Sequence, residues 1–219
     1  FDHNGDIMYF GNPDLVPETS TNTQLGFEYL SNNNSRYELH VFNNEIKNLI
    51  AEQSNPERAD QLEGVNTVFE FTNVNKARTQ GVNLSYQKTF NNIAINTGYS
   101  YLDAVNLQTN KRLPKTSKEQ FHLGVDIFNI KHSRISFKYR FNSKQYADFE
   151  NKEVIGGYDV FDLKFNHDMN KNLAWYFGID NLLDNSPSQY STSGDHGSSG
   201  NDAYPKTPMY MYLGMRLKH

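Results

Sequence analysis

The chain has 219 residues, 21 Lys plus Arg against 25 Asp plus Glu, and no cysteine. This nearly balanced charge gives no electrostatic reason to expect nucleic-acid binding, and the lack of cysteine excludes disulfides and thiolate metal sites. No run of about 18 apolar residues occurs, so the sequence excludes a transmembrane helix. The mean hydropathy of −0.75 is low, but a β-barrel remains possible because only alternate residues of its strands meet lipid.

Near the start of the chain, Gly11, Pro13 and Pro17 rule out a regular element in residues 11–20 (GNPDLVPETS). After that segment, apolar and polar residues alternate along most of the chain. The clearest example is LAWYFGID within residues 173–184, where Leu173, Trp175 and Phe177 alternate with small or polar residues. Strict alternation predicts a strand with one apolar face and one polar face.

The same alternation predicts nine strands in series. They are centred on residues 23–30, 37–41, 82–86, 93–101, 121–127, 135–141, 161–165, 173–179 and 209–217. Arg78 and Gln80 would lie on the apolar face of the third strand. We therefore expect that part to lie beyond a bilayer or to change phase at a bulge.

Short and long connections alternate between these strands. The short turns are near residues 32–35, 91–92, 129–133 and 170–172, and the long segments are near 52–66, 103–119, 145–157 and 185–206. If neighbours pair as hairpins, all long loops lie at one end, which is typical of outer-membrane barrels with short periplasmic turns. The pattern predicts an all-β fold, an antiparallel up-and-down transmembrane β-barrel in the bacterial outer membrane. A soluble β-sandwich is the alternative, in which the apolar face would be packed inside.

Nine is an odd number, whereas single-chain bacterial barrels have even strand counts. A tenth strand within residues 5–10 would close a small barrel, an outer-membrane enzyme or adhesin. We favour an arc of a larger barrel, whose open edge pairs with strands outside this sequence. The chain also begins without the basic and apolar regions of a signal peptide. We expect that an N-terminal part of the parent protein precedes it.

Four segments resemble, in order and spacing, motifs of TonB-dependent outer-membrane receptors. They are GNPDLVPETS at 11–20, NVNKARTQGVNLS at 73–85, GIDNLLD at 178–184 and YPKTPMYMYLGMRLKH at 204–219. The last segment departs from the family pattern at Thr207 and Pro208, and it ends in His219 where an aromatic residue is usual.

The resemblance implies that residues 1–219 are the C-terminal portion of a 22-stranded barrel. Such barrels are filled by an N-terminal plug that binds TonB through a short box, and neither plug nor box is in this sequence. The implied function is active transport of a metal chelate, with a ferric siderophore as the expected cargo. Haem, cobalamin and zinc remain alternative cargoes. The expected partners are the chelate, TonB, the rest of the barrel and plug, and outer-membrane lipid and lipopolysaccharide. No resident cofactor is expected.

Catalysis and metal binding find little support. His40 and His122 lie on the polar side of separate strands, but no motif places a serine or acid beside them, so we expect no enzyme. His196 lies between Asp195 and Asp202. It is a candidate for zinc or haem iron, although an ordinary solvated loop is favoured.

Cationic and aromatic side chains of the long loops are the candidate ligand contacts. Cations there would attract an anionic chelate, contact lipopolysaccharide phosphates or simply be solvated. The ligand candidates are Arg58, Lys111, Arg112, Tyr190, His196 and Tyr204, with Lys115 and Lys118 in the same basic cluster. On the inward polar face, the candidate partners for plug carboxylates are Lys138, Arg140, Lys164 and Arg216.

Overall fold

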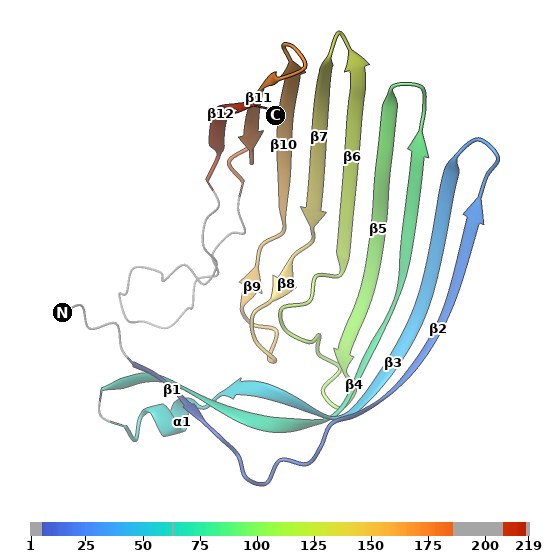
Figure 1. Ribbon diagram of the computed structural model, residues 1–219. Coiled ribbons are helices and arrows are strands. Elements are labelled where there is room, and N and C mark those ends of the chain that lie inside the picture. Colours follow the sequence, from blue (N-terminus) through green and yellow to red (C-terminus); the bar gives the residue numbers. More distant parts are fainter. Residues whose placement is uncertain (1–5, 63, 186–207, 218–219) are drawn as a thin grey trace.

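The computed structural model describes residues 6–62, 64–185 and 208–217 (Figure 1). The strands are β1 (Asp6–Phe10), β2 (Thr19–Leu30), β3 (Ser35–Ser54), β4 (Val65–Thr89), β5 (Ile93–Asn106), β6 (Glu119–Ile130), β7 (Ser133–Asn142), β8 (Gln145–Tyr146), β9 (Val154–Ile155), β10 (Tyr158–Asp168), β11 (Leu173–Asp180) and β12 (Tyr210–Leu217), and one short helix, α1, spans Pro56–Ala59. Within these ranges no helix has the length and apolar character needed to span a membrane.

Nine strands form one antiparallel path in the order β12-β11-β10-β7-β6-β5-β4-β3-β2. Each strand on the path therefore pairs with its neighbours in sequence, while β8 and β9 form a separate two-stranded hairpin inside one connection. Figure 1 shows the short turns at the top of the sheet and the long connections within the described residues at the bottom. The predicted all-β, up-and-down arrangement, its nine strands and its two unlike ends are confirmed.

The sheet is an open arc (Figure 1). Residues 6–10 do form a strand, but β1 pairs in parallel with the far end of β4, from Asp6 opposite Val65 to Phe10 opposite Glu70. It does not join the edges of the arc, which are β2 and β12 in the described part of the chain. The small closed barrel of ten strands is therefore not formed, and the open sheet agrees with part of a larger barrel.

The strand register places apolar side chains in continuous rows on one face. Phe165, Phe177 and Leu213 lie side by side on β10, β11 and β12. These rows are not packed into a core, since Leu213 is 73% exposed and Leu25, at the other edge, is 74% exposed. Exposed contiguous rows of this kind suit lipid and contradict the soluble sandwich.

The described buried hydrophobic cluster is small and lies at the end of the sheet that carries the long connections. It contains Ala77, Ala104 and Leu113, with partly buried neighbours such as Leu102 and Phe149 packed against it. It therefore holds the connections against the extended ends of β4 and β5.

Part of the segment predicted as a loop at 52–66 is instead strand. β3 continues to Ser54 and β4 already begins at Val65, so the connection shrinks to residues 55–64 and contains α1. The two strands keep one register along the whole hairpin, so no bulge changes the phase at Arg78 and Gln80. The loop prediction for residues 52–66 failed because outside a bilayer a hairpin needs backbone pairing but no alternation of apolar and polar residues.

Aromatic side chains cover glycines on the polar face of β11 and β12. A Cβ atom added at Gly178 would lie 2.2 Å from the ring of Tyr212, and one added at Gly214 would lie 2.3 Å from that of Tyr176. The phenol end of each tyrosine thus lies over a glycine of the neighbouring strand. Such contacts help to fix the register of curved sheets.

Candidate functional site

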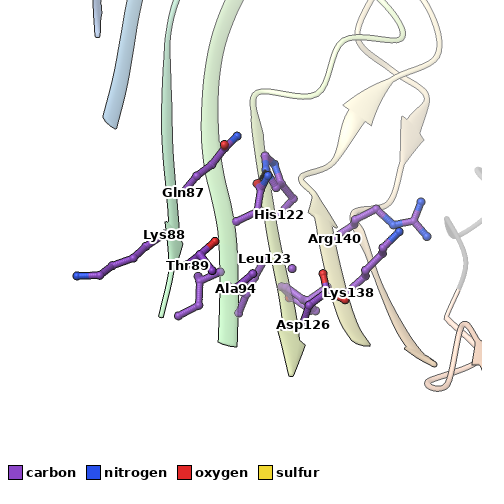
Figure 2. A pocket seen from close by; sticks show the side chains of 13 residues that line it. Gln87, Lys88, Thr89, Ala94, His122, Leu123, Asp126, Lys138 and Arg140 are labelled. Atoms are coloured by element: carbon purple, nitrogen blue, oxygen red, sulfur yellow. Dashed lines mark hydrogen bonds between the residues drawn. The ribbon is translucent and has the colours of Figure 1, made fainter. Parts of the chain in front are cut away.

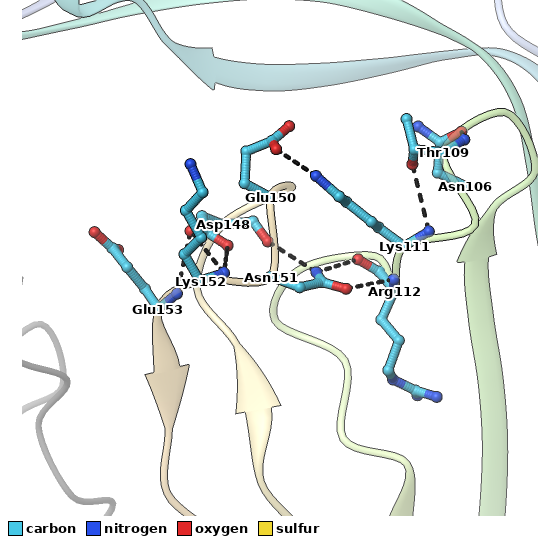
Figure 3. Close-up of polar contacts among 9 residues, drawn as sticks. All are labelled: Asn106, Thr109, Lys111, Arg112, Asp148, Glu150, Asn151, Lys152 and Glu153. Atoms are coloured by element: carbon cyan, nitrogen blue, oxygen red, sulfur yellow. Dashed lines mark hydrogen bonds and ion pairs between the residues drawn. The ribbon is translucent and has the colours of Figure 1, made fainter.

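Two of the long connections meet at their end of the sheet. Their contacting residues form the outer loop cluster, which we define as Lys111, Arg112, Asp148, Glu150 and Asn151. Figure 3 shows Lys111 reaching Glu150, with which it forms an ion pair. The Arg112 backbone N–H donates to Asn151 Oδ1 at 2.7 Å, and Asn151 Nδ2 donates to the Arg112 carbonyl at 2.9 Å. These contacts join loop 107–118 to loop 143–157.

The Arg112 side chain is anchored to strand β5. Its guanidinium donates to the Leu102 carbonyl at 3.0 Å and contacts Asp103 at 3.4 Å. Arg78 lies 3.7 Å from the same carboxylate, and Gln80 donates to it at 3.3 Å. Asp103 is therefore the partner of Arg78 and Gln80, the polar side chains that break the alternation of β4.

The acids in the outer loop cluster, and Glu153 beside it, have unlike environments. Asp148 accepts hydrogen bonds from the backbone N–H groups of Lys152 at 3.0 Å and Glu153 at 3.2 Å, which closes the loop between β8 and β9. The hydrogen bond and charge of Lys111 lower the pKa of Glu150. Burial, with a smaller contribution from Asp148, raises the pKa of Glu153.

Arg58 lies apart from this cluster, on α1 at the tip of the long hairpin. Its guanidinium carbon is 3.8 Å from the ring centroid of Phe10, and it forms an ion pair with Glu70. Asn55 accepts from the Arg58 backbone at 3.1 Å and donates to Glu70 at 3.0 Å. Hydrogen bonds from Asn55 and, next, Arg58 lower the pKa of Glu70.

The three candidate ligand cations in the described residues are thus all engaged with carboxylates. Lys111 and Arg112 share one cluster, whereas Arg58 fastens β1 to the hairpin tip. Tyr190, His196 and Tyr204 lie outside the described residues, so their role as ligand contacts stays a prediction.

A second candidate surface lies on the polar face of the sheet. This inner groove, with a volume of about 560 Å³, is lined among others by Gln87, Asn96, His122, Asp126, Lys138 and Arg140 (Figure 2). His122 Nε2 and Asn96 Oδ1 are 3.1 Å apart, and Arg140 contacts Asp162 at 3.0 Å. Figure 2 shows Lys138 and Arg140 extending in the same direction. The groove offers two neighbouring cations to an acidic partner.

The other two candidate plug contacts lie on the same face but outside this groove. Lys164 is 3.8 Å from Asp180, and its ammonium nitrogen is 5.6 Å from the ring centroid of Tyr212. Arg216 lies opposite Ala174 on the edge strand. The structure therefore brings together Lys138 and Arg140 and does not bring all four side chains together.

The sequence places Asp162 on the polar face but did not make it a candidate site residue, and the structure leaves it only 8% exposed. Its Oδ1 accepts from the Asn181 backbone N–H at 2.9 Å, while its other oxygen meets Arg140. Asn181 also exchanges two hydrogen bonds with Asn185, at 2.9 and 3.1 Å. The GIDNLLD segment is thereby locked to β10 where β11 ends. The signal that could have found Asp162 is its position on the polar face, two residues before Lys164.

The two N-terminal family-like segments also meet. Asn73 accepts from the Val16 N–H at 2.9 Å, donates to the Val16 carbonyl at 3.0 Å and reaches the Asn48 carbonyl at 2.7 Å. Glu18 accepts from the Ile50 N–H at 3.2 Å. One asparagine therefore holds the proline-containing segment against the β3–β4 hairpin.

Among the described residues, no group of three metal-ligating side chains is present.

An open antiparallel sheet with an apolar outer face, a polar inner face and unlike ends defines the wall of an outer-membrane β-barrel. The family model described as "TonB dependent receptor-like, beta-barrel" matches residues 2–182. The chain belongs to this family of outer-membrane receptors, which are not enzymes.

Solved structures share the fold. The copper transporter OprC superposes with a TM-score of 0.72 at 18% identity, over 94% of this chain and 32% of that one. The ferric-catecholate import receptor Fiu of E. coli K12 gives 0.67 at 17% identity, over 94% and 28%. The ferric enterobactin receptor PfeA in complex with BCV-L6 gives 0.68 at 20% identity, over 95% and 32%. The chain thus spans about a third or less of the length of these structures.

Proposed function

We propose that this chain is the C-terminal portion of the barrel of a receptor that imports a metal chelate, with a ferric siderophore as its cargo. The observation that carries the proposal is the family match over residues 2–182. The printed names of several structural neighbours, including the PirA siderophore receptor of Acinetobacter baumannii, support this class of cargo.

In this proposal the barrel wall performs no chemistry. A plug encoded elsewhere in the parent protein captures the chelate together with the outer loops, and TonB supplies the energy that moves the plug. Arg58, Lys111 and Arg112 would attract an anionic chelate to the outer end. Because each is already paired with a carboxylate, direct binding would require these ion pairs to exchange partners.

Lys138 and Arg140 of the inner groove are the strongest candidates for contact with plug carboxylates. Both line one groove on the inward face, and the Arg140 side chain remains 58% exposed despite its contact with Asp162. Guanidinium and ammonium groups bind carboxylates well when water is partly excluded. Lys164 and Arg216 would make separate, more distant contacts. Lipopolysaccharide phosphates are the proposed partners of outward cations near the long loops, such as Lys118.

The test is uptake of an iron isotope, supplied as a ferric catecholate, by iron-starved cells that carry the full-length gene. We expect uptake that disappears in a strain without TonB and in a strain without the gene. Growth with haem as the sole source of iron, and growth limited by cobalamin, zinc or copper, tests the other cargoes in parallel. Uptake of one of these, with no uptake of ferric chelates, would overturn the siderophore assignment and keep the receptor.

The copper arm has a specific reason, since OprC superposes over 94% of this chain. At 18% identity this likeness concerns the fold and does not choose between metals. The matched pair of variants Lys138→Gln and Lys171→Gln then tests the inner wall. Loss of uptake in the first alone would support contact between the groove and the plug.

A further inference from the structure

The outward face carries a second groove, near the end of the sheet that carries the short turns. The proposed transport function does not use this groove. This outer groove has a volume of about 340 Å³ and is lined by residues of five adjacent strands, β2 to β6, with Phe27 as the contribution of β2. Its walls are Tyr37, Leu39, Leu84, Tyr86, Tyr99 and Phe121.

Thr97 creates the hollow. In the strand register it lies between Tyr86 and Leu123, and the next row contains Tyr99 and Phe121. A small side chain between larger ones leaves an unfilled space on the surface. The Thr97 hydroxyl donates to the His122 carbonyl at 2.9 Å, so its polar atom is satisfied and the floor of the groove is apolar.

One end of the outer groove has a cation beside it. Lys88 is two residues beyond Tyr86 on the same face of β4, and its ammonium nitrogen lies 4.7 Å from the ring centroid of Phe90. Lys88 is also among the residues that line the inner groove, but Figure 2 shows its side chain extending away from the other labelled side chains. Among the described residues, no carboxylate forms an ion pair with it.

The depth of this cation identifies the leaflet. Lys88 precedes the short turn between β4 and β5, and short turns of outer-membrane barrels face the periplasm. Tyr37 and Tyr86, with ring centroids 4.9 Å apart, are the kind of residue that lies at headgroup level. An apolar trough with a lysine at its headgroup end matches a lipid with a phosphate and acyl chains.

We propose that the outer groove is a binding site for one phospholipid of the periplasmic leaflet. An acyl chain lies over Thr97 between the rings of Tyr86 and Phe121, and the lipid phosphate pairs with Lys88. The site depends on the outer face meeting lipid and is independent of the cargo, so its test and the transport test can fail separately.

The experiment is native mass spectrometry of the full-length receptor in mild detergent, titrated with phosphatidylglycerol or with a diacylglycerol of the same chains. Lys88→Gln should weaken phosphatidylglycerol retention about fivefold, the effect expected for one cation at an anionic headgroup, and leave diacylglycerol retention unchanged. Thr97→Phe should fill the trough and reduce retention of both lipids. Thr97→Leu is the second filling variant if the phenylalanine prevents assembly.

Two control variants are matched to these changes. Lys171→Gln removes the same charge at another short turn, and Leu213→Phe adds a ring to the outward face of β12. Both should retain phosphatidylglycerol like the unmodified receptor. Equal retention by Lys88→Gln and Lys171→Gln, or undiminished retention in both Thr97 variants, would overturn the proposed site.

Discussion

Asp162 offers the sharpest test of the contacts that hold the outer end of β11. The proposed change is Asp162→Leu, which keeps the branched shape and the number of side-chain heavy atoms and removes both acceptor oxygens. In the structure Asp162 Oδ1 accepts from the Asn181 N–H at 2.9 Å, and Asn181 is only 1% exposed. The change would leave this buried donor without its carboxylate acceptor.

The magnitude follows from the burial of the two partners. A buried donor left unsatisfied costs about 1–3 kcal/mol. The contact with Arg140 adds little, because that side chain is 58% exposed and exposed ion pairs contribute about 0–1 kcal/mol. We expect a local loss of about 2 kcal/mol, which corresponds to roughly 30-fold faster exchange of the Asn181 amide hydrogen.

Hydrogen exchange followed by mass spectrometry, on the receptor in detergent, measures this change. The exchange rate in Asp162→Asn should lie between those of the unmodified receptor and of Asp162→Leu, since the asparagine amide oxygen can still accept from Asn181. Asp180→Asn is the matched control because Asp180 is itself 41% exposed and its Lys164 contact is 3.8 Å long. Unchanged exchange at Asn181 in the leucine variant would refute the assignment of this hydrogen bond as the local lock.

Three further changes test other contacts. Asn73→Ala removes three hydrogen bonds, of 2.7–3.0 Å, and should release the GNPDLVPETS segment, seen as faster protease cleavage there in an intact barrel. Glu150 has a lowered pKa in the fold because of Lys111, so its stabilisation is present above the ordinary glutamate pKa and is lost as pH falls through the lowered value. The protection factors of the loop amides, which correct for the intrinsic pH dependence of exchange, should therefore fall with acid, and should fall less in Glu150→Gln. Gly214→Ala places a Cβ 2.3 Å from the Tyr176 ring and should lower the free energy of unfolding by about 1–3 kcal/mol in denaturant.

Alternation alone was enough to predict the sheet. Phe165, Phe177 and Leu213 come from three separate segments, and alternation predicted each of them on the apolar face. In the structure they form one continuous row across three strands. The reason is that the side-chain direction in a strand depends only on parity, and hairpin connections place sequence neighbours side by side. The same reasoning failed where lipid no longer imposes a pattern, as in the outer part of the β3–β4 hairpin.

The sequence by itself therefore determined the fold class, the two faces, the two ends and the family. Only the tertiary structure decided that β1 runs parallel to β4, that Arg112 meets Asn151 across 39 residues, and that an apolar groove forms one row away from Lys88. The physical reason is range: alternation records the local environment of each strand. Contacts between loops, and hollows between side chains of neighbouring strands, depend on distances that exist only after the sheet has formed.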